Sequence, residues 1–262
     1  MAAQEIRFND GAAYEQMMGV WSRLAGDVFL DWLAPAPGLR WIDVGCGNGA
    51  FTELLVERCA PIEVQGIDPS EAQLAFARSR PAARVAEFRN GSAMELPFAD
   101  GSFDAAVMAL VIFFVPDPSR GVAEMARVVR PGGTIAAYAW DILGGGFPLE
   151  PIRAEMQALG VEVAMPPSPD ASRTETLREL WRTAGLEAIE TREITVLRSF
   201  TGFEDFWTIS LLSPSVGAAI AAMAASDVAQ LKARVQARLP ADAAGRIICS
   251  GRANAVKGRM PK

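Results

Sequence analysis

The sequence predicts an α/β protein with a doubly wound sheet, in which helices cover both faces of mostly parallel strands. Apolar, strand-like runs alternate with helix-like patterns from residue 39 onward, and such alternation is typical of a parallel sheet. The first run, 39–44, leads into a glycine-rich turn and a helix at 49–58, and the second run, 63–68, ends in an acidic residue. Ligands of such sheets bind beyond the carboxyl ends of the strands, so the candidate site lies at that edge.

The remaining elements follow from the spacing of apolar residues and from the positions of Gly and Pro. We expect further strands at 85–89, 103–111, 134–140, 187–198 and 246–256, and core helices at 49–58, 70–79, 118–129, 149–159 and 173–184. One or two amphipathic helices at 12–34 precede the core, and an Ala-rich helical stretch at 203–239 departs from a minimal core.

The charges around the first glycine turn indicate the kind of ligand. The pattern Gly45-x-Gly47-x-x-Ala50 also fits a dinucleotide fingerprint, which holds a pyrophosphate. A pyrophosphate needs positive potential, yet residues 41–57 contain three acids and no Lys or Arg. A carboxylate at Asp43 repels a phosphate and attracts an amino group. The turn therefore favours a ligand with a positively charged group.

A second acid refines this expectation. Asp68 ends the second strand, 23 residues after Gly45, a separation that suits a carboxylate bound to the two hydroxyls of a ribose. The two acids together favour an adenosine with a cationic tail.

Five motifs extend the pattern over residues 39–140. They are Asp43-Val44-Gly45-Cys46-Gly47-Asn48-Gly49, Gly66-Ile67-Asp68-Pro69-Ser70, Gly91-Ser92-Ala93-Met94-Glu95-Leu96-Pro97-Phe98, Phe103-Asp104 and Arg130-Pro131-Gly132-Gly133. In this order and spacing the chain resembles a class I S-adenosylmethionine-dependent methyltransferase, of the small-molecule, type 11-like group. The resemblance implies a Rossmann-like, seven-stranded sheet in the order 3-2-1-4-5-7-6, closed by an antiparallel hairpin of the last two strands.

The resemblance also implies S-adenosyl-L-methionine as cofactor. The glycine backbone would hold its methionine part, Asp43 would lie near its ammonium group, and Asp68 would bind its ribose. Ser92 stands where the family often has Asp, so the contact to the adenine amino group is in doubt. The residues expected to contact the cofactor are Tyr14, Trp21, Arg23, Asp43, Gly45, Cys46, Gly47, Gly49, Asp68, Pro69, Ser92, Ala93, Met94 and Leu110.

Two segments are added to the core of the expected methyltransferase domain at 36–262, one before the domain and one inserted within it. Related enzymes fold residues like 1–35 over the cofactor as lid helices, where Arg23 would pair with the cofactor carboxylate or be a solvated surface residue, and Trp21 would face the cofactor or the core. An insertion at about 201–241 is expected as a helical cap over the substrate, or as a helix pair that packs for stability or in a homodimer.

The acceptor side carries less information. Phe113, Phe114, Trp140 and Phe147 are candidate walls of a pocket for an apolar or aromatic acceptor, although the two Phe side chains equally suit packing beneath a helix. Asp141 is available as a base or as a cap of the following segment. We assign no catalytic residue from the sequence.

Composition excludes several classes of protein. The chain lacks His, so a Ser-His-Asp hydrolase and the usual zinc ligand set are excluded, and no metal is expected. The net charge of −6 disfavours a nucleic-acid partner. Three separated Cys fit a reducing compartment, with Cys46 a packing residue. Met1–Asp10 has no apolar signal region and no run is long enough to span a bilayer, so a cytoplasmic location is expected.

These observations favour an enzyme that transfers a methyl group to an O, N or C atom of a small molecule. Two alternatives remain: an NAD-dependent oxidoreductase on a Rossmann core, and a non-catalytic methyltransferase-like protein that binds the cofactor. The acceptor is not readable from the sequence.

Overall fold

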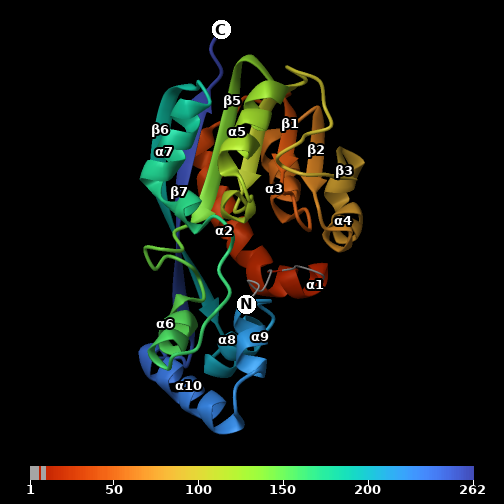
Figure 1. The fold of residues 1–262 in the computed structure, drawn as a ribbon. Helices are drawn as coiled ribbons and strands as arrows, with labels where there is room; N and C mark the ends of the chain where they lie inside the picture. The colour runs from red at the N-terminus through yellow and green to blue at the C-terminus, as the bar shows by residue number, and fades with distance from the viewer. Residues whose placement is uncertain (1–5, 7–9) are drawn as a thin grey trace.

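The computed structural model describes residue 6 and residues 10–262. Its centre is a seven-stranded sheet in the order β3-β2-β1-β4-β5-β7-β6 (Figure 1). Strands β1 to β5 pair in parallel, while β7 runs antiparallel to both β5 and β6. The predicted fold and strand order are therefore confirmed. The strands are β1 Arg40–Val44, β2 Glu63–Asp68, β3 Ala86–Asn90, β4 Phe103–Ala109, β5 Val129–Trp140, β6 Glu187–Phe200 and β7 Ile247–Arg259.

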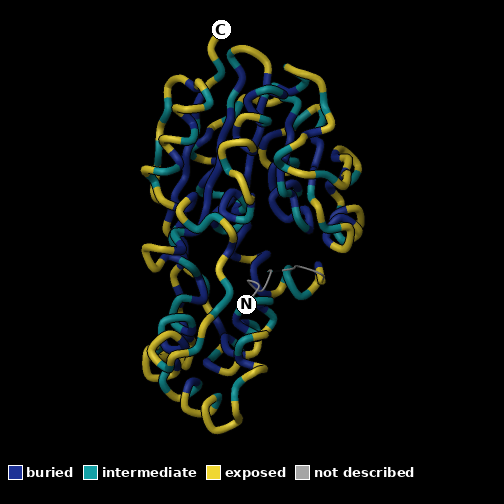
Figure 2. The backbone as a smooth tube through the Cα atoms, viewed as in Figure 1, coloured by how far each residue is buried: buried dark blue, intermediate teal, exposed yellow. Residues whose placement is uncertain are grey.

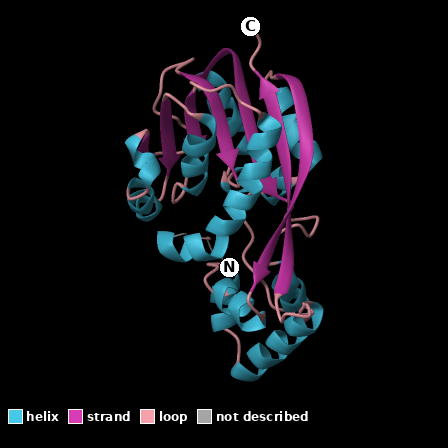
Figure 3. Cartoon of the chain, turned by 180° about the vertical axis from the view of Figure 1, so that it is seen from behind, coloured by secondary structure: helices cyan, strands magenta, loops and turns pink. Residues whose placement is uncertain are grey.

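Helices on both sides bury the sheet (Figures 1 and 3). Helices α2 and α3 pack against each other, as α5 and α7 do, and α4 packs on β2 and β3. Side chains fix several of these helices: the Ser70 hydroxyl caps α4 and the Asp117 carboxylate caps α5. The Trp181 Nε1 of α7 donates to the Ile135 carbonyl of β5 at 3.0 Å. The bounds are α2 Val20–Leu33, α3 Ala50–Cys59, α4 Glu71–Arg78, α5 Pro118–Val128 and α7 Thr174–Thr183.

The core lies in the middle of the sheet, where the backbone is buried almost without interruption (Figure 2). Trp41 on β1 and Tyr138 and Trp140 on β5 are at most 1% exposed. Strands buried on both faces read as continuous apolar runs, which explains why the 103–111 segment has no polar alternation. The strand ends at Ala109, two residues earlier than expected, because Leu110 adopts a left-handed conformation with φ of +63°.

The N-terminal segment crosses the carboxyl edge of the sheet. Helix α1 Gly11–Tyr14 continues through a π-helical turn, Glu15–Gly19, directly into α2. Asp10 caps its start by accepting from the amides of Ala12 and Ala13. The helices expected at 12–34 are present, while residues 1–5 and 7–9 of the expected lid lie outside the described residues. The π-helical turn was not predicted.

A helical subassembly stands beyond the carboxyl edge of the sheet. Strands β6 and β7 continue past the other strands and hold it (Figure 3). It comprises α6 Glu150–Ala158 together with α8 Phe203–Ser210, α9 Val216–Ala221 and α10 Ala225–Arg238. Buried Glu155 on α6 joins α10, since its two oxygens lie 2.5 Å from the guanidinium nitrogens of Arg234 and Arg238. We call this set of four helices the cap. Helices α8, α9 and α10 occupy the segment expected as an insertion.

Membrane-spanning helices and metal-binding clusters are both absent from the part of the chain that the structure describes. None of its helices combines the length and the apolar character that crossing a bilayer requires. In the same part of the chain, no three potential metal ligands come together.

Candidate functional site

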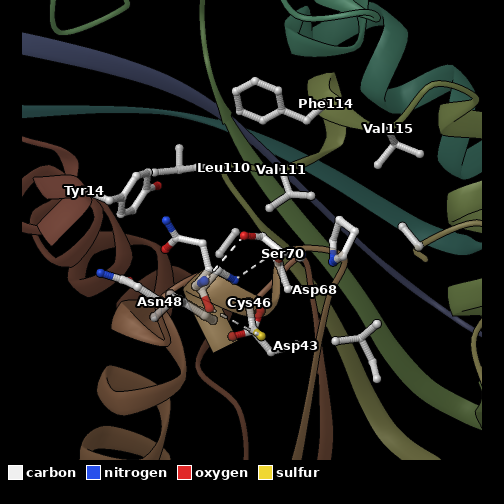
Figure 4. A pocket seen from close by; sticks show the side chains of 18 of the residues that line it. Tyr14, Asp43, Cys46, Asn48, Asp68, Ser70, Leu110, Val111, Phe114 and Val115 are labelled. Atoms are coloured by element: carbon white, nitrogen blue, oxygen red, sulfur yellow. Dashed lines mark hydrogen bonds between the residues drawn. The ribbon is translucent and has the colours of Figure 1, made fainter. Parts of the chain in front are cut away.

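A cavity of about 790 Å³ opens at the carboxyl ends of β1, β2 and β4. Figure 4 shows that Asp43, Cys46, Asp68 and Ser70 gather at one side of this cavity, while Leu110, Val111, Phe114 and Val115 form the other side. The polar side comes from the turns after β1 and β2, and the apolar side from the turn after β4. We call this cavity the large cavity.

The glycine turn after β1 forms its floor. The Gly45 and Cys46 amides both donate to the Ile67 carbonyl, at 2.7 and 3.0 Å, which joins this turn to the end of β2. Gly45 has φ of +77°, and a Cβ there would come within 2.3 Å of the Val111 side chain. Gly47 has φ of +53° and nothing within 4 Å of an added Cβ. Both positions favour glycine because of their positive φ, and at Gly45 a side chain would also lack space.

Asp43 is a buried carboxyl group with one free acceptor. Its Oδ2 accepts from the Thr52 hydroxyl at 2.6 Å, whereas its Oδ1 has no hydrogen-bond partner among the described residues. Burial raises the pKa of Asp43 to about 7; the Thr52 hydrogen bond opposes this shift, and the nearby charge of Asp68 adds to it. A buried acceptor without a partner is costly, so this oxygen is suited to a cationic donor from a ligand.

Asp68 connects the turns after β1 and β2. Its two oxygens accept from the amides of Gly47 at 2.9 Å and Ser70 at 2.8 Å. Burial raises the pKa of Asp68 despite these two hydrogen bonds. Each carboxylate oxygen has a second lone pair, so Asp68 can hold the turn and still accept from two vicinal hydroxyls.

The expected adenine side lies along the same cavity. Pro69, Ser92, Ala93 and Met94 all line it. The Ser92 hydroxyl accepts from the Met94 amide at 3.1 Å, which leaves its own proton available for donation.

The large cavity is acidic. Its charged lining residues are Asp43, Asp68 and Glu71, and no Lys or Arg lines it within the described chain. This distribution fits a ligand with an ammonium and a sulfonium and does not fit a pyrophosphate.

Eleven of the fourteen predicted cofactor contacts line the large cavity, and three do not. Arg23 does not line the cavity; its guanidinium lies 2.8 Å from Glu57 and 3.5 Å from Glu53 on α3, which favours its interpretation as a surface residue. Trp21 is a core residue, packed edge-on against Trp140 with 6.3 Å between ring centroids. Gly49 begins α3 with φ of +78° and faces Ala77 rather than the cavity.

Tyr14 lines the large cavity from the N-terminal helix. Burial raises the pKa of its hydroxyl to about 12, so the phenol stays protonated at neutral pH. Cys46 also lines the cavity, and burial raises its pKa well above the ordinary thiol value. This supports the interpretation of Cys46 as a packing residue rather than a nucleophile.

Sequence reasoning missed the contacts that hold the N-terminal segment against the glycine turn. The Asn48 side chain donates to the Glu15 carboxylate at 2.8 Å and to the Gly11 carbonyl at 3.3 Å. Arg80 donates from Nε to the Asn48 carbonyl at 2.6 Å and pairs with both Glu15 and Glu53. Arg80 is close to these two acids in space but far from them in sequence, so no local sequence pattern predicts the contacts.

A second cavity of about 60 Å³, the small cavity, adjoins the first on the side of the cap. The two share five lining residues, Ile6, Tyr14, Leu110, Phe114 and Met165. The four aromatic residues proposed as pocket walls all line it: Phe113, Phe114, Trp140 and Phe147. Left-handed Leu110 lies at the boundary, and such strain in a non-glycine residue is common at functional sites.

Three polar residues of the small cavity were not predicted. Arg153 comes from α6, and Ser213 and Ser215 come from the segment between α8 and α9. Asp141, the candidate base, lines neither cavity. Its Oδ2 accepts from Arg252 at 2.6 Å and its Oδ1 from the Gly144 amide at 3.0 Å, so the geometry favours its structural role.

Comparisons with known proteins agree with this geometry. Residues 42–137 match the methyltransferase domain family. An uncharacterized methyltransferase of Mycobacterium bovis is 41% identical over 112 residues, 43% of this chain and 44% of that protein. The ubiquinone/menaquinone biosynthesis C-methyltransferase UbiE of Dinoroseobacter shibae is 36% identical over 131 residues, 48% of this chain and 52% of that protein. The matched segments thus span about half of each relative.

One solved structure illustrates the likeness in fold. It is phosphoethanolamine N-methyltransferase 2 of Haemonchus contortus, in complex with phosphomonomethylethanolamine and S-adenosylhomocysteine. The TM-score is 0.60 at 18% identity, over 96% of this chain and 57% of that one. At this identity the likeness concerns the fold alone.

Proposed function

We propose that the chain is a class I S-adenosylmethionine-dependent methyltransferase, which transfers a methyl group from S-adenosylmethionine to a small-molecule acceptor. The observation that carries this proposal is the Oδ1 of buried Asp43, which has no hydrogen-bond partner among the described residues and lies in an acidic cavity that adjoins an apolar one. An orphaned anionic oxygen fits the ammonium of this cofactor.

The described residues would divide the binding of the cofactor among them. The glycine turn would approach the methionine part, Asp43 would accept from its ammonium, and Asp68 would accept from the ribose hydroxyls. Met94 and Ser92, which line the same cavity, would contact the adenine. When bound, the cofactor supplies a methyl group on a positive sulfur that leaves as a neutral thioether. The protein then contributes position and exclusion of water.

The described residues offer no general base at the acceptor side. The chain has no His, the described residues of the small cavity include no carboxylate, and the Tyr14 pKa of about 12 keeps that phenol protonated. We therefore propose an acceptor atom that is already nucleophilic at neutral pH. The transfer to O, N or C is left open.

Calorimetric titration with S-adenosylhomocysteine tests the proposal. We expect the wild-type chain to bind it and Asp68→Ala to weaken binding about 100-fold, because two hydrogen bonds to a charged group are lost. Asp68 also holds Gly47 and Ser70, so circular dichroism and thermal unfolding must show a folded variant. Unchanged affinity would remove Asp68 from the site, and tenfold tighter binding of NAD than of S-adenosylhomocysteine would contradict the proposal.

A further inference from the structure

Arg153 is the charged residue of the small cavity. It lies on α6, its side chain is 17% exposed, and every other described residue that lines this cavity is uncharged. The large cavity next to it has the opposite character, with acids and no described Lys or Arg. The joined space therefore has an acidic end at the glycine turn and a basic end at the cap.

The protein itself gives Arg153 little to bind. Its Nη2 contacts the Met165 sulfur at 2.7 Å, but a thioether is a weak acceptor. The nearest carboxylate among the described residues is Glu150, at 3.9 Å, and the guanidinium lies 5.5 Å from the centre of the Phe147 ring. A guanidinium has five donors, so most of them are available. Burial lowers the pKa of Arg153, and the charge of Glu150 opposes this shift only in part.

Two other arginines near the cap lie much closer to carboxylates. Arg234 lies 2.5 Å from Glu155 in the cap, and Arg252 lies 2.6 Å from Asp141 at the end of β5. A half-buried cation with so weak a pairing costs stability unless something else compensates it. Arg153 has only the 3.9 Å contact with Glu150 and lies directly on a cavity, and this combination points to a ligand.

The surroundings of Arg153 favour a carboxylate. Its planar fork matches a carboxylate through two parallel hydrogen bonds. The hydroxyls of Ser213 and Ser215 line the same cavity and are 3.3 Å apart, so they can donate to such a group. The volume of about 60 Å³ leaves room for a small planar head group.

We propose that the methyl acceptor is an apolar or aromatic carboxylic acid, with Arg153 as the residue that binds its carboxylate. This inference rests on the proposed function. The apolar body would lie against Phe114 and Trp140, with its other end directed past Leu110 toward the large cavity. Arg153 thereby fixes which end of the acceptor meets the methyl donor.

Matched pairs of acids and amides test the proposal. Benzoate, trans-cinnamate and 3-phenylpropanoate, each with its primary amide, are titrated by calorimetry into the chain saturated with S-adenosylhomocysteine, at pH 7.5. We expect at least one acid to bind about tenfold or more tightly than its amide, as for a charge-assisted hydrogen bond. Arg153→Gln should abolish this preference, and Arg153→Lys should retain part of it because the charge remains without the fork.

Arg182→Gln is the matched control. Arg182 is 69% exposed on α7 and pairs with Glu179, away from both cavities, so its loss changes the net charge equally. This variant should keep the wild-type preference for acids. If no acid binds better than its amide, if no probe binds, or if the preference survives in Arg153→Gln, the proposal is overturned. Should Arg153→Gln fail to fold by thermal unfolding, the wild-type and Arg153→Lys titrations still decide it.

The two proposals can fail separately. Arg153 does not line the large cavity, so S-adenosylhomocysteine should bind Arg153→Gln within about twofold of wild type. Failure of the wild-type chain to bind S-adenosylhomocysteine contradicts the proposed function, whereas the acid titrations can still be made without it. Binding of S-adenosylhomocysteine without a preference for acids contradicts only the role of Arg153.

Discussion

The large and the small cavity share a wall but are built in different ways. The large cavity takes its polar groups from short turns that directly follow β1 and β2, and its backbone amides are fixed by Ile67 and Asp68. The small cavity takes its polar groups from α6 and from the segment after α8, which meet only when the cap forms. Under the proposed function, the cofactor would thus meet a local motif, whereas the acceptor would meet a surface assembled from distant segments.

The largest expected effect is that of Gly45→Ala, which changes the large cavity alone. Gly45→Ala places a Cβ within 2.3 Å of Val111 at a φ of +77°, so the turn must move. We expect affinity for S-adenosylhomocysteine to fall more than about 100-fold and the free energy of unfolding to fall by about 2–4 kcal/mol. Calorimetry and urea unfolding measure both.

A matched glycine separates the clash from the backbone conformation. Gly160 has φ of +75° with nothing within 4 Å of an added Cβ. Gly160→Ala should cost only about 1 kcal/mol of stability and leave cofactor affinity unchanged. Equal effects of the two substitutions on binding would show that the contact with Val111 is irrelevant.

The second expected effect is a pH dependence of cofactor binding that follows from the pKa of Asp43. Its value of about 7 in the folded chain exceeds the ~3.9 of an unfolded Asp. We therefore expect affinity for S-adenosylhomocysteine to fall about tenfold per pH unit below 7, as the carboxylate that accepts the ammonium becomes protonated. Asp43→Asn should bind about 100-fold more weakly at pH 8 and lack this component. A remaining pH dependence would belong to Asp68, whose pKa is also raised.

The same shift predicts the stability of the ligand-free chain. Between pH 4 and 7 the folded state holds the proton that the unfolded state loses, so the contribution of Asp43 is full below about pH 4 and declines toward pH 7. At about 1.4 kcal/mol per pKa unit, the loss is at most about 4 kcal/mol. Asp43→Asn should flatten this decline in urea unfolding, and an unchanged decline would contradict the raised pKa.

The smallest expected effect concerns the small cavity alone. The ring of Phe147 lies 5.5 Å from the Arg153 guanidinium, and such cation–π contacts contribute about 0.5–1 kcal/mol. Phe147→Leu should weaken binding of the preferred acid about two- to fivefold and leave S-adenosylhomocysteine affinity unchanged. Calorimetry of both ligands measures this, and a loss confined to S-adenosylhomocysteine would contradict the separation of the two cavities.

The difference in construction explains what the sequence predicted. Asp43, Gly45 and Asp68 lie at fixed positions relative to strand ends, so their place in the sheet followed from strand and turn patterns. Arg153 lies on an amphipathic helix, where an arginine ordinarily reaches solvent. Its burial depends on Met165 and Phe147, which no local pattern brings near it.

The position of Arg23 outside the cavity has a physical cause that the sequence contained. Glu53 and Glu57 are four residues apart on α3 and therefore share one helix face. Helix α2 packs on α3, so this acidic face attracts Arg23 away from the cavity. The π-helical turn at Glu15–Gly19 had no comparable signal, because Asn48 and Arg80 stabilise it from distant elements.

The long strands β6 and β7 have a consequence for how such a chain diversifies. They pair from Glu187↔Arg259 to Phe200↔Ile247, well beyond the other strands, and α8, α9 and α10 are inserted at their far end. We therefore expect that residues 203–238 can be exchanged for another helical set without altering the register of the central strands. Under the proposed function, acceptor preference would then be separable, as a replaceable module, from binding of the methyl donor.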